Sequence, residues 1–249
     1  MPEFAPEDLL NWSGGTWTGA APPARISGYS YDSRILREGE CFVALKTEKR
    51  DGHDFLRAAK DRGASMALVA RPDPAVDLPQ LRVDDPLQAL QAVARGHRER
   101  FAGTVIGLTG SCGKTSTKDL LKLLLDDAQT LATEGNLNNL IGVPITLLRI
   151  DPEAHRFAVI EAGINQPGEM RVMADCIRPD IGMVTMIGPA HLEQLGSEEN
   201  IASEKARLLR GDRLDGRRYF PESCLDYAPF RQLEKRSVVV PPGDGETAD

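Results

Sequence analysis

Short apolar runs alternate with segments of mixed polarity along the second half of the chain. The apolar runs at 104–108, 157–160 and 181–187 are typical of buried strands. Segments with helical spacing of apolar residues predict helices at 114–125, around 138–148, at 167–176 and at 198–209. Strands that alternate with helices form a parallel sheet with helices on both faces. We therefore predict an α/β fold for this half.

The first hundred residues show the same mixture on a smaller scale. Apolar runs at 41–45 and 66–69 predict strands on either side of a helix at 54–63. Asp85, followed by proline, is typical of a helix cap and predicts a helix at 86–101 that leads into the second half.

The length of 249 residues exceeds the ~100–200 of one typical domain, so we predict two. Residues 1–101 form a small α/β domain, and residues 102–249 form the domain with the parallel sheet. The net charge of −7, with scattered basic residues, disfavours nucleic acid as the main ligand. No apolar run approaches the ~20 residues of a membrane span. The four cysteines show no close pairing, which favours a reduced cytoplasm and no metal cage.

A glycine-rich segment follows the predicted strand at 104–108 and opens the next helix. Its residues are Thr109, Gly110, Ser111, Cys112, Gly113, Lys114, Thr115 and Ser116. Glycines let several backbone N–H groups converge, and the helix N-terminus adds positive potential, so the loop favours phosphate. Lys114 would reach the β- and γ-phosphates, and the Thr115 hydroxyl would bind magnesium. The alternative is an ordinary glycine turn, but a Lys-Thr pair there serves no packing purpose. We predict a nucleoside triphosphate site.

Two further residues with useful chemistry stand at predicted strand ends. Glu161 closes the run at 157–160, and His191 follows the run at 181–187. Ligands of parallel sheets bind beyond the carboxyl ends of the strands, and a carboxylate beside a phosphate loop suits magnesium. A neutral imidazole at His191 would join that ion or a second cation. The alternatives are a surface carboxylate and a hydrogen-bonded packing histidine.

Several motifs together resemble the Mur ligases, which add amino acids to peptidoglycan precursors. The phosphate loop is similar to the ATP loop of that family. Segments 135–144 and 161–170 resemble those of the type that adds D-alanyl-D-alanine, and segment 190–197 with Lys205 resembles the histidine and lysine block of the family. Near the N-terminus, Asp32-Ser33-Arg34 and the runs at 42–45 and 51–55 resemble the UDP-substrate domain.

The resemblance implies an ATP-dependent amide-forming ligase. ATP would phosphorylate the terminal carboxylate of a UDP-N-acetylmuramoyl tripeptide, and the amine of D-alanyl-D-alanine would attack the acyl phosphate. The implied catalytic residues are Lys114, Glu161, His191 and Lys205. The implied ligands of Mg²⁺ are Thr115, Glu161, His191 and Lys205, the last after carbamoylation. From the sequence alone, Lys205 would be a solvated helix charge.

The resemblance also assigns contacts to substrates. Asn136 and Asn139 would hold phosphate or substrate oxygens, although turn chemistry beside Gly135 explains Asn136 as well. Ser33 and Arg34, with His53 near them, would contact the uridine nucleotide, because a hydroxyl and a guanidinium suit pyrophosphate and ribose oxygens. A strand-end turn with a surface arginine is the simpler alternative.

The chain departs from the family in two ways. Thr47 and Arg50 stand where a glycine and an aromatic residue are common. Such ligases also have three domains, so we expect the end of the central domain and the acceptor domain to be absent here. The chain is then a fragment, or one half of a ligase whose C-terminal domain is a separate chain. Two other classes stay open: a module that binds ATP and a UDP-sugar without ligation, and a different P-loop enzyme such as a small-molecule kinase.

Overall fold

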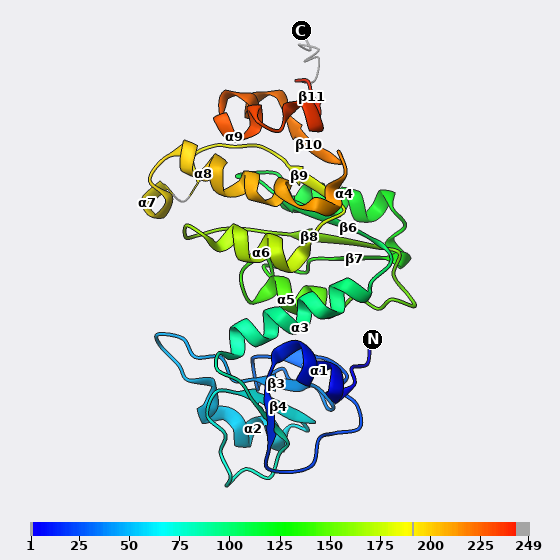
Figure 1. Cartoon of the computed structure of the whole chain (residues 1–249), viewed down its shortest axis with the longest axis vertical. Helices are drawn as coiled ribbons and strands as arrows, with labels where there is room; N and C mark the ends of the chain where they lie inside the picture. Colours follow the sequence, from blue (N-terminus) through cyan, green and yellow to red (C-terminus); the bar gives the residue numbers. More distant parts are fainter. Residues whose placement is uncertain (1, 191, 243–249) are drawn as a thin grey trace. The chain divides into compact units, whose positions relative to one another are not determined.

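The structure is a computed structural model that describes residues 2–190 and 192–242 (Figure 1). The chain divides into two compact units. The first comprises Met1–Phe101 together with Leu147–Pro152, and the second comprises Ala102–Thr146 and Glu153–Asp249. A short segment from within the sequence of the second unit thus belongs to the first, which the hydrophobic pattern does not predict.

The first unit is built on a five-stranded sheet in the order β1-β5-β4-β3-β2, with β1 antiparallel and the other pairs parallel. The strands are β1 (Thr16–Thr18), β2 (Tyr29–Ser30), β3 (Cys41–Val43), β4 (Met66–Val69) and β5 (Gln80–Arg82), and the helices are α1 (Pro6–Ser13), α2 (Leu56–Asp61) and α3 (Pro86–Arg100). The predicted helix at 54–63 is shorter, because a 3₁₀ turn at Gly52–Phe55 precedes α2. The predicted strand at 41–45 ends at Val43.

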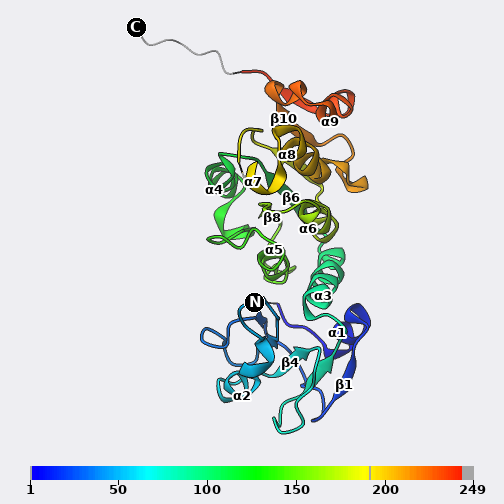
Figure 2. The ribbon, with the colours of Figure 1, turned by 90° about the vertical axis from the view of Figure 1, so that its left-hand side faces the viewer.

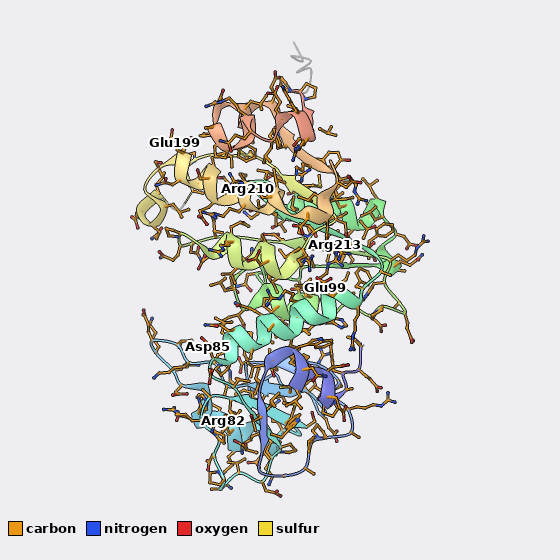
Figure 3. All side chains as sticks on the ribbon, in the orientation of Figure 1. Arg82, Asp85, Glu99, Glu199, Arg210 and Arg213 are labelled. Atoms are coloured by element: carbon orange, nitrogen blue, oxygen red, sulfur yellow. The ribbon has the colours of Figure 1, made fainter. Side chains whose placement is uncertain are left out.

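Helix α3 begins as its sequence predicts and ends against the inserted segment. The Asp85 carboxylate, labelled in Figure 3, accepts the N–H groups of Leu87 and Gln88 and so caps the helix. Near the other end, His97 is buried, and its Nε2 donates to the carbonyl of Ile150 at 2.7 Å. This hydrogen bond joins the segment Leu147–Pro152 to α3 within the first unit.

Replacing His97 with phenylalanine should lower the free energy of unfolding, with an effect that depends on pH. The variant keeps an aromatic ring beside Phe4 but leaves the Ile150 carbonyl without its donor, a loss of about 1–3 kcal/mol for a buried group. Burial lowers the pKa of His97, an effect opposed by the Ile150 hydrogen bond and Asp151 and reinforced by Arg100.

The pH dependence follows from that lowered pKa. Below about pH 6.5, the ordinary pKa of histidine, the unfolded chain takes up a proton that the folded chain resists, so the wild type loses stability as the pH falls. Urea unfolding at several pH values should therefore give a wild-type advantage that is largest above pH ~6.5 and narrows in acid. An advantage that stays constant would mean that His97 is not held neutral.

The second unit is built on a six-stranded parallel sheet in the order β11-β10-β9-β6-β8-β7. The strands are β6 (Thr104–Thr109), β7 (Thr130–Ala132), β8 (Phe157–Glu161), β9 (Ile181–Val184), β10 (Arg218–Pro221) and β11 (Val238–Val240). The helices are α4 (Lys114–Leu124), α5 (Gly142–Leu147), α6 (Glu169–Ile177), α7 (Leu192–Leu195), α8 (Glu198–Lys205) and α9 (Ala228–Arg231). The predicted parallel α/β fold is confirmed.

Several predicted boundaries in this unit are wrong for local reasons. The helix expected around 138–148 begins only at Gly142, because the asparagine-rich stretch before it forms a turn. The strand expected at 181–187 ends at Val184, and the helix expected at 198–209 becomes a 3₁₀ helix after Lys205. The helix expected at 167–176 begins at Glu169, after Gly168 in the left-handed region at φ 89°.

The order of the strands sets up a ligand site at one edge of the sheet. From β6 the chain crosses through α4 to β7, and from β8 it crosses through α6 to β9 on the other side of β6. Crossovers between parallel strands are right-handed, so α4 and α6 cover opposite faces, as Figure 2 shows. Such a change of direction opens a crevice beyond the carboxyl ends of the central strands.

Among the described residues, no helix combines the length and the apolar composition that crossing a membrane requires.

Candidate functional site

The glycine-rich loop follows β6 as predicted and is held tightly against the end of β9. Gly113 adopts φ 79° at the start of α4, a conformation that favours glycine. A Cβ on Gly110 would lie 1.8 Å from the hydroxyl oxygen of Thr185. That hydroxyl donates to the carbonyl of Cys112 at 2.5 Å. Gly110 is therefore required by the close approach of Thr185, a residue that the sequence pattern did not single out.

Two hydroxyl groups of the loop are already engaged with neighbouring backbone. Ser111 Oγ donates to the carbonyl of Gly188 at 2.9 Å and accepts the Gly188 N–H at 3.1 Å. Thr109 Oγ1 donates to the carbonyl of Ala162 at 2.7 Å. These contacts fix the loop between the ends of β8 and β9. Cys112 and Ser116 are exposed.

Two ammonium groups converge on one carbonyl of the loop. Lys114 Nζ donates to the carbonyl of Gly110 at 2.9 Å, and Lys205 Nζ donates to the same oxygen at 3.0 Å. Lys205 is 2% exposed, so its interpretation as a solvated helix charge is wrong. Burial, and then the charge of Lys114, lower the pKa of Lys205 to about 8. The two positive groups are thus brought together at the loop.

Glu161 ends β8 beside the loop, paired in register with Leu108 of β6. Its side chain is buried, so the surface alternative is wrong. One carboxylate oxygen accepts the hydroxyl of Thr115 at 3.2 Å, and the other accepts Nδ2 of Asn138 at 2.8 Å. A hydroxyl and a carboxylate on adjacent elements are the hard oxygen donors that Mg²⁺ prefers.

The donor set also fits the way magnesium is usually held. The described residues contain no group of three His, Cys, Asp or Glu side chains that could hold a metal. Mg²⁺ needs no such cage, because it binds one or two protein ligands and completes its shell with phosphates and waters. Thr115 and Glu161 provide such a pair.

The asparagine-rich motif contributes a residue that sequence reasoning missed. Asn138, rather than its neighbours, contacts Glu161. Asn139 Oδ1 accepts the N–H groups of Ile141 and Gly142 and so caps α5, while Asn136 is exposed beside Gly135, whose φ is 53°. Three asparagines within four positions gave no signal for which one faces the carboxylate. His191 lies outside the described residues.

A second polar group forms at the carboxyl ends of β2, β3 and β4 in the first unit. Arg34 follows β2 and forms a bidentate pair with Asp32, whose pKa falls to about 2 mainly through that hydrogen bond. The Arg34 side chain is 74% exposed and so is accessible to an anion. Ser33 lies half-buried between the two residues.

His53 stabilises this edge through hydrogen bonds of both ring nitrogens and does not face the solvent. Its Nδ1 lies 2.6 Å from the Asp51 carboxylate, and its Nε2 accepts the N–H groups of Ala70 and Arg71. The hydrogen bond from His53 is the main cause of a pKa near 2 for Asp51. Arg71 also pairs with Asp51 through its side chain. Arg71 is the second residue after β4, and this place just beyond a strand end was the signal in the sequence that could have marked it as a site residue.

Two known families match these two regions of the chain. The family described as Mur ligase family, catalytic domain, matches residues 25–98. The family described as Mur ligase middle domain matches residues 108–222.

Individual relatives agree with those matches. The UDP-N-acetylmuramoyl-tripeptide–D-alanyl-D-alanine ligase of Escherichia coli is 45% identical over 82% of this chain and 44% of its own length. The ligase of the same name from Synechocystis is 40% identical over 77% of this chain and 43% of its own length. The chain therefore spans less than half the length of these curated relatives.

Solved structures show the same partial coverage. A crystal structure of MurF from Acinetobacter baumannii superimposes with a TM-score of 0.89 at 33% identity, over 98% of this chain and 54% of that one. The MurF ligase of Thermotoga maritima, solved in complex with ADP, gives 0.74 at 28% identity, over 86% of this chain and 49% of that one.

Proposed function

Because the chain belongs to the Mur ligase family, we propose that it carries the ATP site and the UDP-substrate site of a ligase that joins D-alanyl-D-alanine to UDP-N-acetylmuramoyl tripeptide. The observation that carries this proposal is the buried Glu161 carboxylate facing the Thr115 hydroxyl beside a phosphate loop. A glycine turn with a purely structural role does not require a buried carboxylate paired with a hydroxyl at this position. The residues of the second unit then serve the activation of a carboxylate by ATP.

Each residue has a separate task in this scheme. The loop N–H groups and Lys114 bind the β- and γ-phosphates and neutralise charge as the γ-phosphoryl group moves to the carboxylate. Thr115 and Glu161 would hold Mg²⁺, which supplies further positive charge to the phosphates. Asn138 and Thr115 orient the two oxygens of Glu161. We propose Asn136, Asn139 and His191 as further contacts to substrate or metal.

Lys205 is the position at which we propose a carbamoylated lysine. Carbamoylation requires a neutral amine that attacks carbon dioxide, and a pKa near 8 makes the neutral amine abundant in mildly alkaline solution. The amine nitrogen bonds to the carbon of carbon dioxide and gives up one proton to solvent, so a carbamate with two oxygen donors replaces the cation. This would remove the repulsion with Lys114 and would give a further ligand for magnesium. We also propose a cytoplasmic location, since the four cysteines are free thiols.

The substrate assignment can be tested at Arg34. Replacing Arg34 with alanine should weaken the binding of UDP-N-acetylmuramic acid to the full chain by about 1.5–3 kcal/mol, the contribution of a hydrogen bond to a charged group. Isothermal titration calorimetry measures the loss. A small-molecule kinase of the P-loop class would show no binding even as the wild type.

The matched control is Arg82, labelled in Figure 3. It is an exposed arginine on β5, separated from β2 by two strands, so its replacement with alanine should leave the affinity unchanged. Equal losses for the two variants would point to a general effect of charge and would contradict a nucleotide site at the end of β2.

A further inference from the structure

The only buried residue in the eleven of helix α4 is a lysine, Lys118, although the helix also carries several leucines. Lysine is almost never fully buried unless its charge has partners. Its ammonium donates to the carbonyl of Thr133 at 2.9 Å and pairs with Asp119 at 2.9 Å. Because Asp119 is largely exposed, the Thr133 carbonyl is the partner inside the protein.

Thr133 connects this ammonium to Glu161. The residue is 1% exposed and follows directly after β7. Its N–H donates to the carbonyl of Val159 in β8 at 3.0 Å, and its hydroxyl oxygen accepts the N–H of Glu161 at 2.9 Å. Thr133 thus binds β8 at two points, two residues apart, at the place where the strand delivers its carboxylate.

The same helix carries the other half of the proposed metal pair. Thr115 lies three residues before Lys118, so the two side chains share one face of α4. Thr115 contacts the Glu161 carboxylate, and Lys118 contacts the residue that holds the Glu161 backbone. The separation between α4 and the end of β8 is therefore fixed on both sides of the carboxylate.

We propose that Lys118 and Thr133 are positioning residues that set the distance between the Thr115 hydroxyl and the Glu161 carboxylate for magnesium. This inference rests on the proposed function of that pair. Mg²⁺ demands near-ideal octahedral geometry with short bonds, whereas Ca²⁺ accepts flexible shells and longer bonds. A slight movement of α4 away from the end of β8 would therefore weaken the binding of Mg²⁺ more than the binding of Ca²⁺. If Lys118 and Thr133 had a purely structural role, their replacement would weaken the binding of both ions equally.

The test measures the affinity of the full chain for a non-hydrolysable ATP analogue in EDTA, in Mg²⁺ and in Ca²⁺. Lys118→Met keeps the length of the side chain and removes the ammonium. Changes beyond the direct ligands of a metal typically cost about 10–100-fold in metal affinity. In this variant, we expect the increase in affinity for the analogue that Mg²⁺ produces to be smaller by at least ~10-fold. The increase that Ca²⁺ produces should shrink less, and the affinity in EDTA should hardly change. Lys122→Met is the control, since Lys122 lies on the same helix with a side chain 39% exposed.

Thr133→Val keeps the test decisive if Lys118→Met does not fold. Valine retains the shape and the backbone carbonyl but loses the oxygen that accepts the Glu161 N–H. The same selective loss of magnesium is expected, and Thr133→Ser should restore it. Equal losses with and without metal, or an unchanged response to Mg²⁺ in both variants, would overturn the positioning role. A wild-type chain whose affinity ignores magnesium would instead overturn the metal site itself.

Discussion

A protein of these 249 residues alone should ligate D-alanyl-D-alanine at a rate many orders of magnitude below that of an ordinary enzyme, while still binding ATP with magnesium. The phosphate loop and the proposed metal pair lie within the chain. The relatives are about twice as long, and we place the groups that orient the amine in the part that is not matched. Orientation supplies about 7–11 kcal/mol of a barrier, and its loss is the largest effect that we expect.

Phosphate release and ligated product, measured together on the isolated chain, check this expectation. The unmatched C-terminal portion of the Escherichia coli ligase, supplied as a second chain or fused in cis, should restore product formation. Lys114→Ala in the restored enzyme controls for contaminating ligase. A turnover of about one per second without any addition, the low end for ordinary enzymes, would show that these residues suffice.

The hydrophobic pattern was most informative where a strand is long and buried. The runs that became β6 and β8 alternate with helices, and their ends carry the loop and Glu161, so the edge of the sheet could be located from the sequence. The strands of the second unit that were missed, β7, β10 and β11, have three or four residues each. Runs so short show no recognisable period, and their strand pairing comes from neighbours distant in sequence.

Side-chain roles that depend on tertiary contacts could not be predicted in the same way. Lys205 and Lys118 look like charges on exposed helices, yet both are buried, and each ammonium donates to a backbone carbonyl, of Gly110 and of Thr133 respectively. His53 matched a substrate motif, but both ring nitrogens are engaged within the protein. A sequence motif identifies which residues gather at a site, and it does not say which of them faces the ligand.

Replacing Lys114 with alanine should abolish the stabilisation that ATP with magnesium gives to this chain. Lys114 is the loop residue whose ammonium we assign to the β- and γ-phosphates. A ligand whose free concentration is ~100 times its dissociation constant stabilises the folded protein by about 2.7 kcal/mol. Without ligand the variant should fold at least as well, because Lys114 and Lys205 repel each other at the carbonyl of Gly110. Thermal unfolding with and without ATP measures the difference, and Lys122→Ala, a change at a half-buried lysine on the same helix, should keep the full shift. If ATP raised the melting temperature of the Lys114 variant as much as that of the wild type, the segment from Thr109 to Ser116 would not be the phosphate loop.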